Sequence, residues 1–185
     1  MSAEDVLLVG CCLRGEPGAV QELIERFQSN VFGLCVRLLR HRQDAEDVTQ
    51  EVFLRVFRSL KRWDSTRSLK PWIMGITVNR CRTWLSQRAR RPELIAYLQD
   101  TAASPAADGS AELAREIQLA VEELRLEYQS VFVMFHEQGQ PYEAIAEALG
   151  KPVGTIKTWL RRARLEVLDR LRRRGMISEV DDELP

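Results

Sequence analysis

The sequence predicts an all-α protein of two small helical domains joined by a flexible linker, with a helix-turn-helix in the second domain. Apolar residues recur at helical spacing through long stretches of the chain. A small, polar, Pro/Gly-containing stretch interrupts this periodicity, and two short helical patterns around a glycine follow it. We expect a first domain over residues 1–91, a linker over 92–111, a second domain over 112–175 and a frayed acidic tail over 176–185.

Length and composition limit the class of protein. The chain has 185 residues, enough for one or two small domains, and its apolar fraction of 45% is ordinary for a globular protein. No apolar run approaches the roughly 20 residues that a membrane span needs, and the N-terminus lacks a basic start followed by an apolar block. The sequence therefore predicts a cytoplasmic protein without membrane insertion.

The formal net charge is zero, but the charges are segregated along the chain. Residues 55–91 carry eleven basic side chains against one acid, and residues 151–175 carry nine against two. The excess acids lie in residues 44–51, 93–147 and 179–183. Two separate cationic blocks on one chain predict two contacts with nucleic acid.

The cysteine and histidine pattern gives no indication of a metal site. The four cysteines include no Cys-x-x-Cys pair, and no cysteine lies at ligand spacing from either of the two histidines. Cys35 and Cys81 fall in apolar helical patterns and are expected to be small core residues. We expect no metal and no cofactor.

The first domain begins with three expected helices, over residues 4–14, 19–39 and 44–60. The third has Asp44 as a good N-cap and crowds further acids into its first turns, where the helix dipole favours negative charge. Valines at helical spacing can face inward and leave Phe53 or Leu54 partly outward. An acidic half followed by apolar residues suits docking on a basic protein partner, although the acids could also serve only as caps.

Residues 61–70 are expected to form a polar loop, and Pro71 is expected to begin a basic helix that runs to residue 91. Trp63 and Trp72 flank the loop. Tryptophans interleaved with arginines can hold unstacked bases of a single strand, but tryptophans at helical spacing more often belong to a core.

The helix-turn-helix is expected over residues 142–164, with its last helix continuing to about Arg173. Gly150 can take the positive φ that the turn needs. Small apolar residues on the first helix permit a close crossing, and polar and cationic side chains cover one face of the second helix. A major groove accepts such a face, because residues near the start of a recognition helix reach base edges while cations hold phosphates.

In this order the segments resemble a bacterial RNA polymerase sigma factor of the sigma-70 family, in its extracytoplasmic-function group. The resemblance covers residues 19–173 and implies a protein that is not an enzyme and has no catalytic residues. It implies core RNA polymerase and promoter DNA as partners, and it leaves room for an anti-sigma factor. The larger domains of housekeeping members are absent from this sequence, so promoter choice is expected to rest on two elements.

The resemblance also implies three groups of contact residues. The expected polymerase contacts are Asp44, Asp47, Gln50, Glu51 and Phe53. The expected contacts with the opened downstream element, where Asn79 matches a position used for base recognition, are Trp63, Ser65, Asn79, Arg80 and Arg82. The expected contacts with the upstream element are Thr155, Lys157, Thr158, Arg161 and Arg162.

The chain departs from the family pattern in two places. Trp159 stands where many relatives have arginine, so either a phosphate contact is lost or the tryptophan packs inward. Residues 123–125 replace a frequent Leu-Pro pair, so the turn there can differ.

Two other functions fit parts of the sequence. A two-domain regulator could bind an operator through the same helix-turn-helix, but a basic, Trp-bearing helix after a polar loop has no purpose in a sensor domain. A helical RNA-binding protein would have no preference for promoter duplex.

Overall fold

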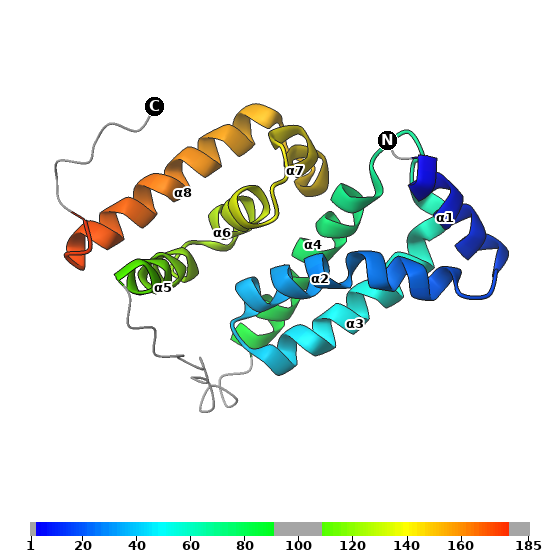
Figure 1. Ribbon diagram of the computed structural model, residues 1–185, viewed down its shortest axis with the longest axis horizontal. Coiled ribbons are helices and arrows are strands. Elements are labelled where there is room, and N and C mark those ends of the chain that lie inside the picture. Colours follow the sequence, from blue (N-terminus) through cyan, green and yellow to red (C-terminus); the bar gives the residue numbers. More distant parts are fainter. Residues whose placement is uncertain (1–2, 91–108, 178–185) are drawn as a thin grey trace.

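The computed structural model describes residues 3–90 and 109–177, and in these ranges the chain forms helices and turns without a strand (Figure 1). The predicted all-α class with two helical domains is confirmed. The expected linker falls outside the described residues except at its end, where α5 begins at Gly109. The expected acidic tail lies outside them apart from residues 176 and 177.

The first domain is built around three long helices that pack on one another. Its described elements are α1 (Ala3–Arg14), α2 (Ala19–Leu39), α3 (Arg42–Ser59), η1 (Leu60–Arg62) and α4 (Leu69–Ala89). Val31 and Leu34 of α2, Val48 of α3 and Ile73 of α4 are fully buried, as their helical spacing requires. Cys81 of α4 lies 3.8 Å from Cys35 of α2, sulfur to sulfur, inside this core, so both cysteines are small core residues as expected.

Two helix starts differ from the sequence prediction. The N-cap of α3 is His41 and not Asp44, because the His41 Nδ1 accepts a hydrogen bond from the Asp44 backbone amide at 3.2 Å. A neutral imidazole has one nitrogen that can accept such a hydrogen bond, and the Asp44 carboxylate is paired with Arg88 of α4. Helix α4 begins at Leu69, two residues before Pro71. Proline is tolerated there because amides of a first turn have no acceptor within the helix.

Helices α3 and α4 are joined by two ion pairs. The Arg80 guanidinium donates to the Glu51 carboxylate, and the Arg88 guanidinium donates to the Asp44 carboxylate. The Arg80 side chain is only 8% exposed, so this cation depends on its partner. The pairs fix how α4 lies along α3.

The second domain packs short helices on one long helix. Its described elements are α5 (Gly109–Glu122), α6 (Leu126–Phe132), the π-helical turn η3 (Val133–Glu137), α7 (Tyr142–Leu149) and α8 (Val153–Arg173). Ile145 of α7 and Ile156 of α8 are fully buried between the two helices of the predicted helix-turn-helix. Gly150 joins them with a φ of 60°, and its amide donates to the last turn of α7. This turn is confirmed.

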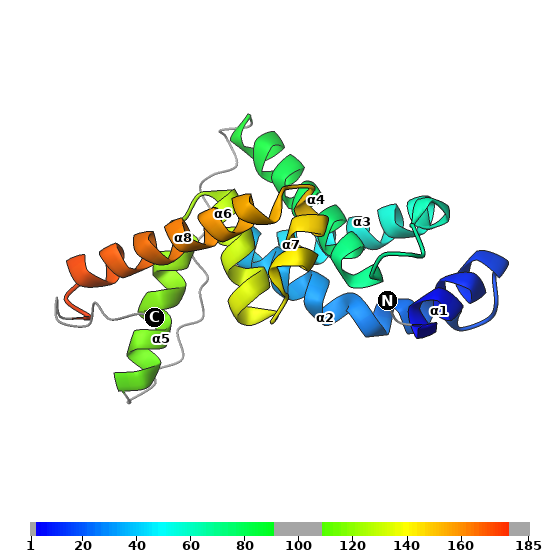
Figure 2. The ribbon, with the colours of Figure 1, turned by 90° about the horizontal axis from the view of Figure 1, so that it is seen from above.

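The two domains lie against each other. Figures 1 and 2 show α7 beside α4, so the first helix of the helix-turn-helix contacts the last helix of the first domain. A second contact brings α6 and η3 to α2.

We expect Gly150→Ala to destabilise the protein by about 1–2 kcal/mol, because a Cβ in the left-handed region is sterically strained. Gly154→Ala is the matched control, since Gly154 lies in the first turn of α8 with no atom within 4 Å of an added Cβ. Urea unfolding, monitored by circular dichroism, measures the free energy of unfolding of both variants. Equal values for the two variants would contradict the left-handed turn assigned to Gly150.

We expect Glu51→Ala to lower the free energy of unfolding by about 1–3 kcal/mol, because it leaves the buried Arg80 without its carboxylate. The value falls short of that for a fully buried pair because the Glu51 side chain is 40% exposed. Asp47→Ala, an exposed acid on the same helix, should change stability by less than about 0.5 kcal/mol. If the two variants unfold alike, Arg80 does not depend on Glu51.

Candidate nucleic-acid interface

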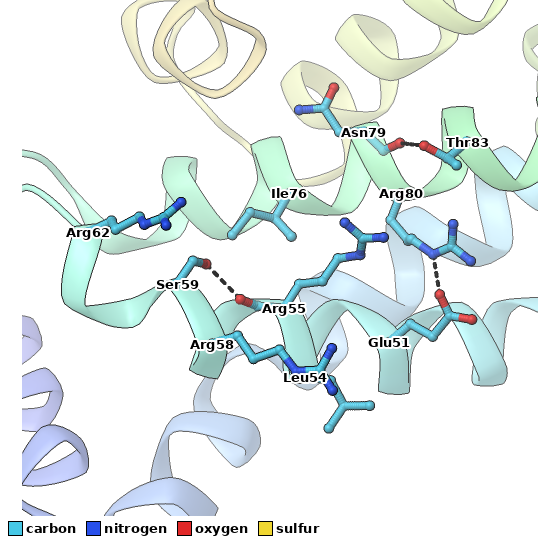
Figure 3. A pocket seen from close by; sticks show the side chains of 10 residues that line it. All are labelled: Glu51, Leu54, Arg55, Arg58, Ser59, Arg62, Ile76, Asn79, Arg80 and Thr83. Atoms are coloured by element: carbon cyan, nitrogen blue, oxygen red, sulfur yellow. Dashed lines mark hydrogen bonds and ion pairs between the residues drawn. The ribbon is translucent and has the colours of Figure 1, made fainter.

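A basic groove runs between α3 and α4 on the surface of the first domain. It has a volume of about 700 Å³. Arg55 and Arg58 of α3 and Arg62 of η1 follow one another at i, i+3 and i+7 along one wall (Figure 3). Such spacing places side chains on one face of a helix. Three guanidinium groups therefore line this side of the groove.

The opposite wall has the same periodicity but a different chemistry. It consists of Ile76, Asn79 and Thr83 of α4, again at i, i+3 and i+7 (Figure 3). Asn79 is exposed, and its side-chain oxygen accepts a hydrogen bond from Arg82 at 3.1 Å. An amide has both donors and acceptors for a base edge, and a row of arginines attracts a phosphate backbone. The groove thus combines the two kinds of contact that a single strand needs.

Sequence reasoning missed the arginine wall. Its basic block begins at Arg55, but the expected contacts in this block started only at Trp63. The i, i+3, i+7 spacing of Arg55, Arg58 and Arg62 was the available signal. This spacing is hard to notice because the second half of α3 follows an acidic first half and contains several apolar residues.

Two residues expected to contact DNA are buried here. The Arg80 guanidinium is turned to Glu51 at one end of the groove, and it is not free for a phosphate in this conformation. Trp63 is 9% exposed and belongs to the core, so its ring does not offer a surface on which a base could stack.

The loop before α4 has a preformed turn. The Asp64 carboxylate accepts hydrogen bonds from the Thr66 hydroxyl at 2.7 Å and from the Thr66 amide at 2.9 Å. These hydrogen bonds, chiefly the hydroxyl's, lower the pKa of Asp64, so the turn holds its charged form. Ser65 is exposed at the tip of this loop. It is the expected contact that the loop presents to solvent.

The recognition helix α8 presents most of its expected contacts outward. Lys157, Thr158, Arg161 and Arg162 are exposed, whereas Thr155 is half-buried. The Arg162 guanidinium also donates to the Tyr128 hydroxyl at 3.3 Å, which raises the Arg162 pKa. Arg162 therefore links the recognition face to the core of its own domain.

The two departures from the family pattern meet in one contact. Trp159 is half-buried with its ring 6.5 Å from that of Tyr128, so this tryptophan packs inward. Arg125 is the N-cap residue of α6, and its guanidinium lies 4.0 Å from the Tyr128 ring and 6.0 Å from the Trp159 ring. Both unusual residues lie against the same tyrosine ring, with Arg125 over its face and Trp159 tilted beside it.

The expected polymerase contacts separate into free and engaged residues. Asp47 and Gln50 are exposed. Asp44 and Glu51 are held in the ion pairs with α4, and Phe53 is buried at 6% exposure. Leu54 is the outward apolar side chain, at 55% exposure. The outward stripe of α3 is therefore Asp47, Gln50 and Leu54, at i, i+3 and i+7.

Within the described residues, no three acids, histidines or cysteines gather as a metal site would require. Over the same residues, no helix is long and apolar enough to cross a bilayer. What the surface does offer is a basic groove in one domain and a polar, cationic helix face in the other.

Comparisons with known proteins also divide the chain into two parts, one with the groove and one with the helix-turn-helix. Residues 23–91 match the family model described as Sigma-70 region 2, and residues 114–167 match Sigma-70, region 4. The first match holds the groove, and the second holds the helix-turn-helix.

Whole-chain relatives point the same way. The ECF RNA polymerase sigma factor SigE of Mycolicibacterium smegmatis is 31% identical over 157 residues, which cover 81% of this chain and 60% of that protein. The RNA polymerase sigma-H factor of Pseudomonas aeruginosa is 27% identical over 180 residues, covering 90% of this chain and 93% of that one. The ECF RNA polymerase sigma-E factor of Haemophilus influenzae is 29% identical, with coverage of 86% and 91%.

Solved structures share the fold. The sigma factor RpoE of Bartonella quintana, in complex with the anti-sigma factor NepR, superposes with a TM-score of 0.69 at 21% identity, covering 84% of this chain and 98% of that one. CnrH, in complex with the cytosolic domain of CnrY, gives the same score and identity over 90% and 96%. With both sigma regions present in order on one chain, and with relatives over most of its length, this protein belongs to the sigma-70 family, in its extracytoplasmic-function group.

Proposed function

We propose that this sigma factor binds core RNA polymerase through α3, reads an upstream promoter element with α8 and holds the opened downstream strand in the α3–α4 groove. The observation that carries this proposal is the groove itself, which is lined by three arginines and by Asn79. An operator-binding regulator needs only the recognition helix and has no use for this groove.

The polymerase contact is proposed for the outward stripe of α3. Asp47, Gln50 and Leu54 combine an acid, an amide and an exposed leucine on one face. A basic helical partner would pair with the acid and cover the leucine. Leu54 takes the place that the sequence reasoning gave to Phe53, because Phe53 is in the core.

The downstream contact is proposed for one unpaired strand. Arg55, Arg58 and Arg62 would follow its phosphates while Asn79 reads a base edge. Taking a base out of a duplex costs a few kcal/mol. Contacts that the groove makes with the unpaired strand, and not with the duplex, would offset this cost. The exposed Ser65 lies in the loop at the start of α4, where a displaced base would arrive.

The upstream contact is proposed for the first turns of α8. Lys157, Thr158 and Arg161 are exposed and would enter a major groove, with the cations on phosphates. Trp159 would stay with Tyr128, so this position contributes packing instead of a phosphate contact.

The two contacts would reinforce each other through the chain between them. We propose the divisions expected from the sequence, 1–91, 92–111, 112–175 and 176–185, with the linker raising the effective concentration of the second contact once the first is made. The protein would act with the polymerase in the cytoplasm and perform no chemistry itself. RpoE bound to NepR, and CnrH bound to the cytosolic domain of CnrY, support an anti-sigma partner for this chain too.

In vitro transcription tests the function. Purified core polymerase with this protein should yield specific transcripts from genomic fragments, and core polymerase alone should not. Asp47→Arg with Gln50→Arg should abolish them, because one cation replaces the acid and a second is added on the face that meets a basic partner, while neither residue lines the groove. Glu25→Arg, the same change of charge at an exposed acid on α2, should leave them intact. No specific transcript with the unaltered protein would refute the proposed function.

Two different assays should distinguish the two DNA contacts. Lys157→Ala with Arg161→Ala should weaken binding to duplex and lower its salt dependence by about one in slope per lost phosphate contact. Asn79→Ala should leave duplex binding nearly unchanged and reduce the reactivity of unpaired thymines with permanganate, because its base is accessible only in the opened strand.

The controls are exposed residues outside the two faces. Arg173→Ala at the far end of α8 and Gln87→Ala beyond the groove on α4 should affect neither assay. Equal effects of the two test variants in both assays would refute the proposed separation. Arg162 is left unaltered because it bonds to Tyr128.

A further inference from the structure

One edge of the recognition helix is turned back to its own domain. Thr155, Trp159 and Arg162 follow one another at i, i+4 and i+7, so they share this edge of α8. Thr155 is half-buried, Trp159 is half-buried beside Tyr128, and the Arg162 guanidinium donates to the Tyr128 hydroxyl. A DNA backbone that passes along this edge therefore meets side chains that α8 already uses for packing and hydrogen bonding.

Arg125 brings a cation to this edge from a different helix. It is the N-cap residue of α6, and its guanidinium lies 4.0 Å from the centroid of the Tyr128 ring and 6.0 Å from that of Trp159. The Arg125 side chain is 54% exposed, so much of the guanidinium stays open to solvent. Its planar fork of N–H donors matches the oxygens of a phosphate. The edge thus has an accessible arginine that α8 itself does not supply.

The tyrosine restrains this arginine before any ligand arrives. Tyr128 is 4% exposed and belongs to the core of the domain, so its ring gives a fixed surface. A guanidinium over an aromatic face is attracted by the ring and stacks on it. An arginine held in this way loses less side-chain entropy on binding a phosphate than one that moves freely.

A nearby carboxylate does not block the site. Glu127 lies 3.8 Å from the Arg125 Nε, and its side chain is 35% exposed. Ion pairs between accessible side chains contribute little, because water and salt screen them. The phosphates of a duplex carry a dense row of negative charge, so one of them can replace Glu127 as the partner of Arg125.

A second cation lies on the same side of the recognition helix. Lys151 is exposed just before the start of α8, and it lines a crevice of about 410 Å³ together with Arg125 and Trp159. Two positive side chains from outside α8 therefore flank the tryptophan. This arrangement gives the edge the charge that its own helix directs inward.

We propose that Arg125, held on the ring of Tyr128 and placed beside Trp159, is a DNA-phosphate contact of the second domain. This proposal rests on the proposed function, because it takes the first turns of α8 as the part that meets duplex DNA. It extends that interface to the start of α6. Phosphate contacts position a protein on the duplex without reading its sequence, so Arg125 helps to fix how α8 lies in the major groove.

Arg125→Gln tests this contact, and Arg115→Gln is its matched control. Both variants replace an exposed arginine of the second domain by a neutral polar side chain. Arg115 lies in α5 next to Glu116, which pairs at 2.7 Å with Arg174, the C-cap residue of α8. The control therefore lies near the opposite end of the recognition helix.

The measurement is binding of the full-length chain to a labelled duplex, followed by fluorescence anisotropy over a series of salt concentrations. A mixed-sequence duplex of about 30 base pairs, roughly three helical turns, suffices because a phosphate contact does not depend on sequence. Each such contact makes the affinity fall with about the 0.9 power of the salt concentration. Circular dichroism should show native helix content in every variant, because the altered side chains are exposed.

Arg125→Gln should lower the salt slope by about 0.9 and weaken binding about eightfold at about 0.1 M salt, but only about threefold at about 0.3 M. Arg115→Gln should keep the slope of the unaltered protein. Arg125→Lys retains the charge and should also keep that slope, which a role in packing alone would not explain. Equal slopes for Arg125→Gln and Arg115→Gln, or a slope for Arg125→Lys as low as that for Arg125→Gln, would overturn the proposed contact.

Transcription with core polymerase separates this proposal from the proposed function. Specific transcripts from the unaltered protein, together with equal slopes for Arg125→Gln and Arg115→Gln, would overturn the Arg125 contact and leave the sigma function standing. A slope lowered in Arg125→Gln alone, with no specific transcripts from the unaltered protein, would refute the sigma function and support the contact.

Discussion

The contact between Arg80 and Glu51 determines how the first domain presents its surface. Arg80 is nearly buried, and a buried guanidinium without a carboxylate is strongly unfavourable, so α4 can lie along α3 only where the two groups meet. The Arg88–Asp44 pair repeats this restriction further along the same two helices. With the two helices held together at two points, Arg55 and Arg58 of α3 line one groove with Ile76 and Asn79 of α4. The groove follows from where the ion pairs put the two helices.

The sequence predicts those parts of the fold that depend on local pattern. The apolar spacing of α2 gives its bounds, and Gly150 marks the turn of the helix-turn-helix because only a positive φ fits there. Side-chain partners far apart in sequence are not predictable in this way. Arg80 looks like one more cation in a basic block until Glu51, 29 residues earlier, is found against it.

The same limit explains why several side chains at the candidate site lie elsewhere than expected. Periodicity alone leaves the choice between Phe53 and Leu54 open, and the packing of α3 on α2 and α4 buries the phenylalanine. Trp63 has the chemistry of a stacking platform and the burial of a core residue. His41 replaces Asp44 as N-cap because Asp44 has a partner on α4 that no local pattern reveals. In each case the fold uses the side chain in a way that the local pattern does not reveal.

Helix α4 is used on three faces, and this accounts for its unusual composition. Ile73, Thr77 and Cys81 face the core, Ile76, Asn79 and Thr83 line the groove, and Gly75, Val78 and Arg82 lie under the second domain. A helix with a single buried stripe can place polar residues over most of its circumference. Here each turn must supply a core residue, a groove residue and an interface residue. Val78 is nearly inaccessible because it lies under the second domain together with Gly75. The groove and the interface are adjacent strips of one helix, so the helix that brings Asn79 to the groove also carries the contact between the two domains.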